Sequence, residues 1–220
     1  MCLSLQGIEE KGTCNVNKFG HLDLACYGGI GKYQFPQVHP VTEMPDIDSW
    51  VQFNYVKTTR KDRKRTGVNF YIVDQQFERV WNFPDRYAKE LSEFGAITGP
   101  DFSTYLDFPE AVRIWNTYRN RWLTRYWQEK GLTVIPEVGW GLEKSWEWCF
   151  DGLPKHSIVS VSNVGTMTSK RDRDNFMRGY NEMLRRLDPI LVLFYCHKIE
   201  NYAGNVRFIK FSLDKSVHSC

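Results

Sequence analysis

The sequence lacks most of the patterns that identify a functional class. None of its six cysteines forms a CxxC pair, the usual spacing of a structural zinc site. No full glycine-rich fingerprint of a P-loop or a dinucleotide site is present. Charge of one sign does not dominate either, because 29 basic residues stand against 26 acidic ones. Attraction for nucleic acid would therefore have to come from local clusters of cations.

Long apolar runs are absent near the start of the chain. Glu9, Glu10 and Lys11 interrupt the first stretch before a signal peptide or a membrane-spanning helix could form. We therefore expect a cytoplasmic protein without a membrane partner, whose cysteines are free thiols in a reducing compartment. We predict no metal-binding residue, and the sequence indicates no particular cofactor.

Aromatic residues, in contrast, are plentiful. The 220 residues include 8 Trp, 11 Tyr and 14 Phe, and 42% of the chain is apolar. This composition is enough to bury one substantial core, but that core cannot hold every aromatic side chain. We therefore expect some of the aromatic rings to line a groove or pocket.

The chain divides into two parts of different character. Residues 1–45 contain several glycines and prolines and no long periodic segment, which predicts an irregular N-terminal arm. Residues 46–220 alternate strand-like and helix-like segments, which predicts a single α/β domain. Apolar runs of strand length lie at 51–56, 68–73, 96–98, 133–136, 158–161, 190–195 and 206–211. Helical spacing lies at 86–94, 109–130 and 170–187.

Helices between strands act as crossovers, and crossovers favour parallel neighbours. Near-continuous apolar strands such as ILVLFY and VNFYIV fit a parallel sheet that is covered on both faces. We therefore predict a TIM-barrel-like α/β fold, irregular or incomplete, with an open doubly wound sheet as the alternative. The segment 57–66, KTTRKDRKRT, leaves no room for a helix between two strands and is predicted to be an exposed hairpin or a disordered basic tip.

Three carboxylates directly follow predicted strands. Asp74 follows VNFYIV, Asp101 comes shortly after AIT, and Glu137 follows TVIP. Because the carboxyl ends of parallel strands meet at one mouth, we expect the three carboxylates to share a pocket. Their charges would separate their pKa values into an acid and a base or nucleophile. Alternatively, Asp74 caps the next helix, Asp101 caps a turn with Ser103, and Glu137 is solvated.

Other polar groups follow the later strands. The segment SNVGTMTS and the helix after it favour a contact between backbone N–H groups and a phosphate or sugar. The predicted ligand-binding residues at these strand ends are Trp140, Ser162, Asn163 and Thr166. His197, which comes after ILVLFY, is either a catalytic base or proton shuttle or a structural histidine.

Two basic features suggest nucleic-acid binding. The segment 57–65 concentrates six cations that no fold requirement explains, and we predict that they contact phosphates. These cations are Lys57, Arg60, Lys61, Arg63, Lys64 and Arg65. The helix at 109–130 interleaves arginines with aromatic rings, which suits phosphate contacts combined with base stacking. The alternative for this helix is ordinary amphipathicity, with aromatic rings inward and arginines in solvent.

Three segments resemble a known family. FERVWNFP, PDFSTYLDFPEAVRIWNTYRNRW and GLTVIPEVGW are similar to the uncharacterised phage and mobile-element family catalogued as domain of unknown function 4417. The similarity covers roughly residues 46–195, and PDFS and NxYRxRW are its most specific parts. The resemblance implies that the protein is encoded by a phage, prophage or mobile-element genome. It therefore also implies that the protein is located in the host-cell cytoplasm. It implies no activity.

More distantly, the chain resembles the tRNA-guanine and DNA transglycosylases, which are TIM barrels with aspartates at strand ends. Asp74 and Asp101 would be residues of that kind. Those enzymes hold zinc through a late cluster of closely spaced cysteines and a histidine. The corresponding region of this chain offers Cys196, His197, His218 and Cys220. This departure from the pattern argues against transglycosylase activity.

Two hypotheses follow from the sequence. The first is an enzyme whose carboxylate pocket acts on a nucleotide, a nucleobase or a glycosidic bond, with Asp101 or Glu137 as nucleophile or base and Asp74 as partner. The second is a non-catalytic phage effector that binds nucleic acid, a nucleotide signal or a host protein. Convergence of the three carboxylates in one pocket would favour the first.

Overall fold

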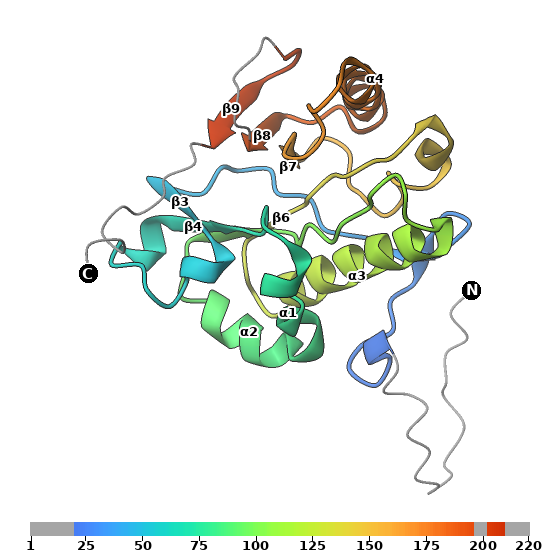
Figure 1. Cartoon of the computed structure of the whole chain (residues 1–220). Helices are drawn as coiled ribbons and strands as arrows, with labels where there is room; N and C mark the ends of the chain where they lie inside the picture. Colours follow the sequence, from blue (N-terminus) through green and yellow to red (C-terminus); the bar gives the residue numbers. More distant parts are fainter. Residues whose placement is uncertain (1–19, 196–201, 210–220) are drawn as a thin grey trace, which may run out of the picture.

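The computed structural model describes residues 20–195 and 202–209. They form a mixed α/β structure with two parallel sheets and one short antiparallel hairpin (Figure 1). The predicted α/β class with parallel strands is therefore confirmed. Within these residues, no helix is both long and apolar enough to cross a membrane.

The elements follow the predicted order closely. The first sheet contains β3 (Ser49–Gln52), β4 (Thr66–Asn69), β5 (Ala96–Thr98) and β6 (Val134–Ile135), and the second contains β7 (Ile158–Ser162), β8 (Leu191–Tyr195) and β9 (Val206–Ile209). The hairpin consists of β1 (Gly29–Ile30) and β2 (Phe35–Pro36). The helices are α1 (Arg79–Asn82), α2 (Pro84–Leu91), α3 (Glu110–Glu129) and α4 (Lys170–Leu187), and 3-10 turns lie at Phe53–Tyr55, Arg63–Arg65, Asp74–Gln76 and Glu143–Glu147. Every predicted strand and helix has a counterpart, with ends that move by a few residues.

The strand order in both sheets is the order along the chain, and all neighbours are parallel. A bridge between Glu137 and Ser160 links the sheets, because Ser160 N–H donates to Pro136 O (2.8 Å) and Val138 N–H donates to Ser160 O (2.9 Å). In the described part of the chain, β3 and β9 do not pair with each other, so the closed TIM barrel is not confirmed. The doubly wound alternative is not confirmed either, since that fold reverses its strand order and the described strands do not.

The connection from β3 to β4 differs from the prediction. These strands are parallel, so residues 53–65 form a crossover with two 3-10 turns and not a hairpin. The crossover returns the chain to the amino-terminal edge of the sheet. There, the carbonyl oxygens of Arg63 and Arg65 accept hydrogen bonds from the N–H groups of Gly95 and Asp48, just before β5 and β3.

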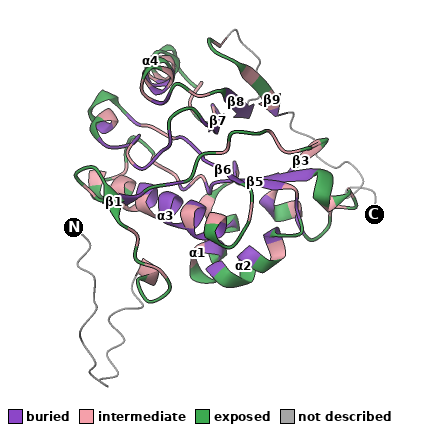
Figure 2. Cartoon of the chain, turned by 180° about the vertical axis from the view of Figure 1, so that it is seen from behind, coloured by how far each residue is buried: buried purple, intermediate pink, exposed green. Residues whose placement is uncertain are grey.

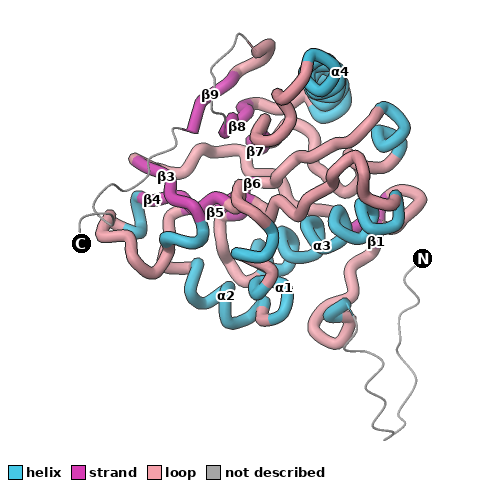
Figure 3. The backbone as a smooth tube through the Cα atoms, in the orientation of Figure 1, coloured by secondary structure: helices cyan, strands magenta, loops and turns pink. Residues whose placement is uncertain are grey.

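Alternate side chains of each strand face opposite sides of the sheets. On β8, Val192 and Phe194 pack toward α4, whereas Leu193 and Tyr195 enter an inner cluster to which both sheets contribute. The buried members of this inner cluster are Tyr71, Ala96, Ile135, Ile158, Leu191, Leu193, Tyr195 and Ile209. Helices α1, α2 and α3 cover the other face of the first sheet, and α4 covers that of the second (Figure 1, Figure 3).

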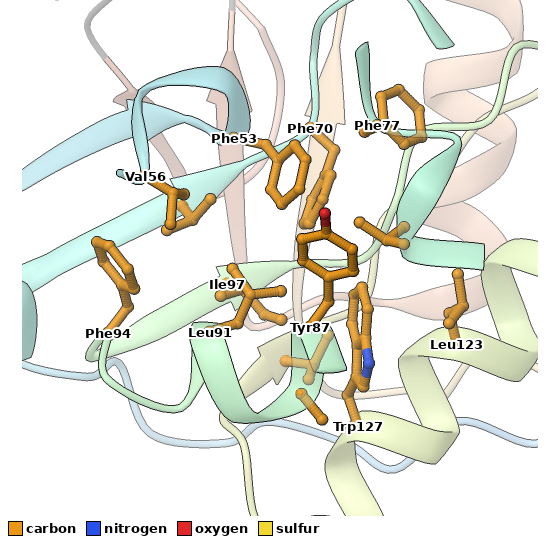
Figure 4. Packing of buried hydrophobic residues seen from close by; sticks show 14 of the residues in the cluster. Phe53, Val56, Phe70, Phe77, Tyr87, Leu91, Phe94, Ile97, Leu123 and Trp127 are labelled. Atoms are coloured by element: carbon orange, nitrogen blue, oxygen red, sulfur yellow. The ribbon is translucent and has the colours of Figure 1, made fainter. Parts of the chain in front are cut away.

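The aromatic side chains concentrate between the first sheet and its helices. Phe70 stacks on Phe53 with ring centroids 5.0 Å apart, and on Trp127 of α3 with centroids 5.9 Å apart (Figure 4). Tyr87 meets the edge of Phe53 from α2. Offset and edge-to-face contacts of this kind add to the free energy gained by burying the rings. Much of the aromatic content is therefore used in the core.

The N-terminal arm lies against both sheets. Phe35 and Val38 are buried, and the carbonyl oxygen of Val41 accepts a hydrogen bond from Ile158 N–H at the start of β7. The blue segment that leads to β3 runs between the two sheets, where Val41, Met44 and Ile47 pack against the inner cluster (Figure 1). The division of the chain at residue 45 stays a prediction. Neither Cys26 nor Cys149 forms a disulfide, and the other four cysteines lie outside the described residues.

Candidate active site

A cavity of about 530 Å³ opens at the carboxyl ends of β4 to β7. Its wall includes Tyr71 after β4, Asp101 after β5, Glu137 after β6, Ser162 at the end of β7 and Phe176 of α4. We call this cavity the carboxylate pocket. Its volume lies in the range of sites that hold a small molecule, roughly 300–1,000 Å³. Asp101 and Glu137 therefore share one pocket.

Asp101 is half-buried and faces the cavity. Burial, followed by the charge of Asp74, raises the pKa of Asp101 from 3.8 to about 7. No described residue donates a hydrogen bond to the Asp101 carboxylate, so no hydrogen bond from the described residues stabilises its charged form. Asp101 therefore changes its charge near neutral pH, which suits a group that exchanges protons during a reaction.

Glu137 is more deeply buried, with 5% of its surface exposed. Asn120 Nδ2 donates to Glu137 Oε2 (2.7 Å), and Arg121 Nη1 donates both to Asn120 Oδ1 (2.6 Å) and to the Glu137 carbonyl oxygen (3.3 Å). Burial and the charge of Asp101 raise the pKa of Glu137 well above its usual value, although Arg121 and Asn120 act in the opposite direction. The protonated form of Glu137 is therefore favoured more than in a solvated glutamate, and the alternative of a solvated Glu137 is wrong.

Asp74 lies outside the wall of the cavity and holds its neighbouring loop. Its carboxylate accepts hydrogen bonds from Ser103 Oγ (2.7 Å) and Ser103 N–H (3.1 Å). It also begins the 3-10 turn Asp74–Gln76. The partner of Ser103 is thus Asp74 and not Asp101, so the alternative of an Asp101–Ser103 turn is wrong. Asp74 acts on the pocket through its charge, which raises the pKa of Asp101.

The two groups that hold Glu137 come from α3, which is unusually buried for a helix rich in arginine (Figure 2). Pro109 precedes its first turn, and Gly131, with φ of +85°, follows its end. Arg121 is 2% exposed and donates to the carbonyl oxygens of Cys149 (2.7 Å) and Asp151 (3.2 Å). Arg119 is 8% exposed and lies over the Phe102 ring, 3.9 Å from its centroid. The prediction of solvated arginines is wrong for these two side chains.

Tyr71 adds a further proton-bearing group to the pocket wall. It is 4% exposed, and its ring stacks on Tyr195 with centroids 5.1 Å apart. Ser160 lies close to the Tyr71 hydroxyl but does not complete a hydrogen bond of normal geometry with it, so this hydroxyl has no partner among the described residues. Burial, together with the charges of Glu137 and Asp101, raises the pKa of Tyr71 well above 10.

Three of the four predicted ligand-binding residues line the pocket, and one does not. Trp140, Ser162 and Thr166 line the pocket, and Trp140 packs on Phe176 with ring centroids 5.0 Å apart. Asn163 does not line it. Its Nδ2 donates to the Tyr202 hydroxyl (3.1 Å), and its carbonyl oxygen accepts from Thr166 Oγ1 (2.9 Å), so it shapes the loop after β7.

The amino-terminal end of α4 is already satisfied by its own side chains. Ser169 Oγ accepts from Asp172 N–H (3.1 Å), and the Asp172 carboxylate accepts from Ser169 Oγ (2.7 Å) and Thr168 Oγ1 (2.6 Å). These hydrogen bonds lower the pKa of Asp172. The small and hydroxyl residues at 162–169 therefore build a cap that carries a negative charge.

The remaining predicted residues lie elsewhere. His197 lies outside the described residues. The basic loop, residues 57–65, contributes no residue to the pocket wall, and its last part, Arg63–Arg65, lies at the amino-terminal edge of the first sheet. Arg65 forms ion pairs with Asp46 (2.5 Å) and Asp48 (2.6 Å), Arg63 pairs with Glu93, and Lys64 Nζ donates to the Ser92 carbonyl oxygen. Lys57 and Arg60 are exposed.

The residues missed by the sequence analysis are Tyr71, Asn120 and Arg121. A signal was available for the last two, because both fall in the NxYRxRW segment. Asn120 Nδ2 also donates to the Pro100 carbonyl oxygen (2.6 Å), so this segment packs directly on the PDFS segment. Among the residues that the structure describes, no group of three His, Cys, Asp or Glu side chains is arranged to hold a metal ion.

Fold and site together define a parallel α/β protein with a buried acidic pocket at its strand ends. Comparison with known families shows that the chain belongs to the family described as Domain of unknown function (DUF4417), whose model matches residues 27–212. Two similar proteins are each called "Gene 1 protein". The one from Mycobacterium phage D29 is 35% identical over 181 residues, which cover 81% of this chain and 66% of that protein.

The other, from Mycobacterium phage L5, is 34% identical over 181 residues, which cover 81% of this chain and 78% of that protein. The chain therefore spans 66% of the length of the D29 relative. These matches confirm the predicted family and its association with phages. No solved structure matches the chain.

Proposed function

We propose that this chain is an enzyme that cleaves or exchanges a glycosidic bond of a nucleotide, a nucleoside or a related nucleobase compound. The observation that carries the proposal is one cavity with two carboxyl groups of unequal acidity. Burial raises the pKa of Asp101 to about 7, and burial together with the charge of Asp101 raises the pKa of Glu137 well above its usual value. Carboxyl groups whose pKa values differ in this way can act as base and acid in one reaction.

Each group has a defined role in the proposed hydrolysis. The neutral Glu137 carboxyl donates its proton to the departing base as the bond between C1′ and the base nitrogen breaks. The Asp101 carboxylate takes a proton from a water molecule, whose oxygen forms the new bond to C1′. Asn120 and Arg121 position Glu137 for this step. Asp74 raises the pKa of Asp101 without entering the pocket wall.

The position and walls of the pocket support this choice of substrate. The pocket lies at the carboxyl ends of parallel strands in chain order, the place where α/β barrels carry their active sites. Trp140, which is half-buried and lines the pocket, supplies an aromatic face for a planar base. Ser162 and Thr166 would contact a sugar.

The test is to incubate the purified protein with nucleosides, nucleotides, tRNA and DNA, and to measure free base by chromatography and mass spectrometry. We expect release from at least one substrate, with a rate that rises as pH increases through about 7 because Asp101 must be ionised. Asp101→Asn and Glu137→Gln should reduce release to background without lowering the melting temperature. Asp23→Asn, a surface variant distant from the pocket wall, is the control. Release that persists in both pocket variants, or no release from any substrate, would overturn the proposal.

The second hypothesis, a non-catalytic phage effector, is favoured by one observation. Val73, Tyr105, Leu106 and Val164 line the pocket and are also 40–55% exposed, which gives its mouth an apolar rim suited to binding a partner. Under this hypothesis the pocket binds a nucleotide signal, a nucleic acid or a host protein without chemistry. Binding that is unchanged in Asp101→Asn, with no product formed, would favour the effector.

A further inference from the structure

The charged side chains that the structure describes in the wall of the carboxylate pocket are all acidic. Its carboxyl groups belong to Asp101, Asp107, Glu137 and Asp172, and none of its described residues is a lysine or an arginine. A phosphate group that entered this cavity would meet negative charges and no cation. In a partly buried site such repulsion is weakly screened by salt.

The pocket also lacks an uncapped helix amino terminus, which can bind a phosphate in place of a cation. A helix amino terminus attracts phosphate through its unpaired N–H groups, but Ser169 and Asp172 already cap α4, and Asp172 lines the cavity. Its carboxylate brings a negative charge to the place where a phosphate would bind. The geometry therefore works against an anionic ligand at the end of the pocket next to α4.

Other groups in the pocket are suited to a planar ring with polar edges. Tyr71 lines the cavity, and its buried hydroxyl has no hydrogen-bond partner among the described residues. An unpaired buried hydroxyl is costly unless a ligand completes it. Asp101 also offers both oxygens as acceptors for N–H groups. Trp140, which is half-buried and lines the pocket, supplies a face on which a ring can stack.

We propose that the carboxylate pocket binds an uncharged or cationic nucleobase, with or without its sugar, and that it discriminates against the phosphate esters of the same compound. This inference rests on the proposed function for its choice of nucleosides, but it concerns binding and does not require turnover. N–H groups of the base would donate to Asp101, and the Tyr71 hydroxyl would pair with a polar atom of the ring. A phosphate, where the natural ligand has one, would stay outside the cavity.

The experiment is isothermal titration calorimetry of the full chain at about pH 8 and low salt. The probes are adenosine, guanosine, cytidine and uridine, each beside its own 5′-monophosphate. We expect at least one nucleoside to bind at least tenfold more tightly than its monophosphate. Because charges in a partly buried site are screened little by salt, this ratio should largely persist at about 1 M salt. A monophosphate that binds as tightly as its nucleoside, or four nucleosides that do not bind, would overturn the inference.

A charge variant makes the test specific to the pocket. Asp107 is exposed and lines the pocket, so Asp107→Asn removes one negative charge with little risk to folding. We expect it to tighten monophosphate binding severalfold while nucleoside binding stays the same. Asp23→Asn removes an equal charge outside the pocket wall and should leave the ratio unchanged. Equal effects of the two variants would overturn the inference.

The result is separable from that of the proposed enzyme. Preferential nucleoside binding without release of free base would support the inference and contradict the enzyme. Release of base from a tightly bound monophosphate would support the enzyme and contradict the inference.

Discussion

Asp101 and Glu137 reach the same cavity from the loops after neighbouring parallel strands, and the charge of Asp101 raises the pKa of Glu137. The two carboxyl groups are buried by different amounts and have different partners, so their pKa values are shifted by different amounts. Asn120 donates a hydrogen bond to Glu137, whereas no described residue donates one to the Asp101 carboxylate. This difference is the basis of the first prediction.

We predict that Asp101→Asn stabilises the protein at about pH 8. The pKa of Asp101 rises from 3.8 to about 7 on folding, so the folded state binds the proton more tightly. Wild-type stability should therefore fall as pH increases from about 4 to about 7, and the neutral amide should avoid a loss on the order of 4 kcal/mol. Urea unfolding at several pH values measures this effect. A variant less stable than the wild type at pH 8 would contradict the assignment.

We predict that Arg121→Met lowers the free energy of unfolding by about 3–5 kcal/mol. The change leaves the carbonyl oxygens of Cys149 and Asp151 without their buried donor, and it also removes the partner of Asn120. Chemical unfolding gives the value. Arg86→Met, at an exposed position of α2, should cost less than about 1 kcal/mol. Similar losses for the two variants would mean that the buried network contributes little.

We predict that Gly179→Ala disturbs the wall of the pocket. A Cβ at Gly179 of α4 would lie 2.1 Å from Trp140 Nε1, so the indole must move. Nucleoside binding should weaken at least tenfold and the near-ultraviolet circular dichroism should change, although alanine favours a helix by about 1 kcal/mol. Asn181→Ala, at an exposed position of the same helix, is the control. Unchanged spectra and binding would show that Trp140 does not need this close contact.

We predict that the N-terminal arm is required for a stable protein. Phe35 is fully buried and packs on Trp148 with ring centroids 6.3 Å apart. Phe35→Ala should cost about 3–5 kcal/mol, and Ile30→Ala, which changes an exposed side chain of the same hairpin, should cost far less. Removal of residues 1–45 should expose apolar surface and cause aggregation. A monomeric, cooperatively folded truncation would show the arm to be dispensable.

We predict that the basic loop and the pocket act independently, because no residue of the loop lines the pocket. If the protein binds DNA or RNA through this loop, Lys57→Gln with Arg60→Gln should lower the slope of log affinity against log salt by about two. Nucleoside binding in the pocket should not change. Filter binding at several salt concentrations measures the slope. Equal slopes for variant and wild type would exclude these two side chains from phosphate contact.

The sequence by itself determined the local elements. The strand at 96–98 and the helix at 170–187 have the predicted bounds, because apolar periodicity and capping residues act over a few neighbours. It also placed Asp101 and Glu137 at one mouth, since the ends of consecutive parallel strands meet there. Two of the three segments that carry the family resemblance, those that begin at Pro100 and Gly131, contribute residues to the wall of this pocket.

Only the tertiary structure decided how these elements are used. The cation-rich segment 57–65 became a crossover with ion-paired Arg65, because its two strands are parallel and the chain must return to the other edge. Arg121 and Glu137 are buried because α3 lies between two parts of the core. The spacing of residues along one helix does not predict this position. The burial of each carboxyl group and the charges beside it, which shift its pKa, depend on partners distant in sequence. That is why the sequence could bring the two carboxyl groups to one pocket but could not tell their pKa values apart.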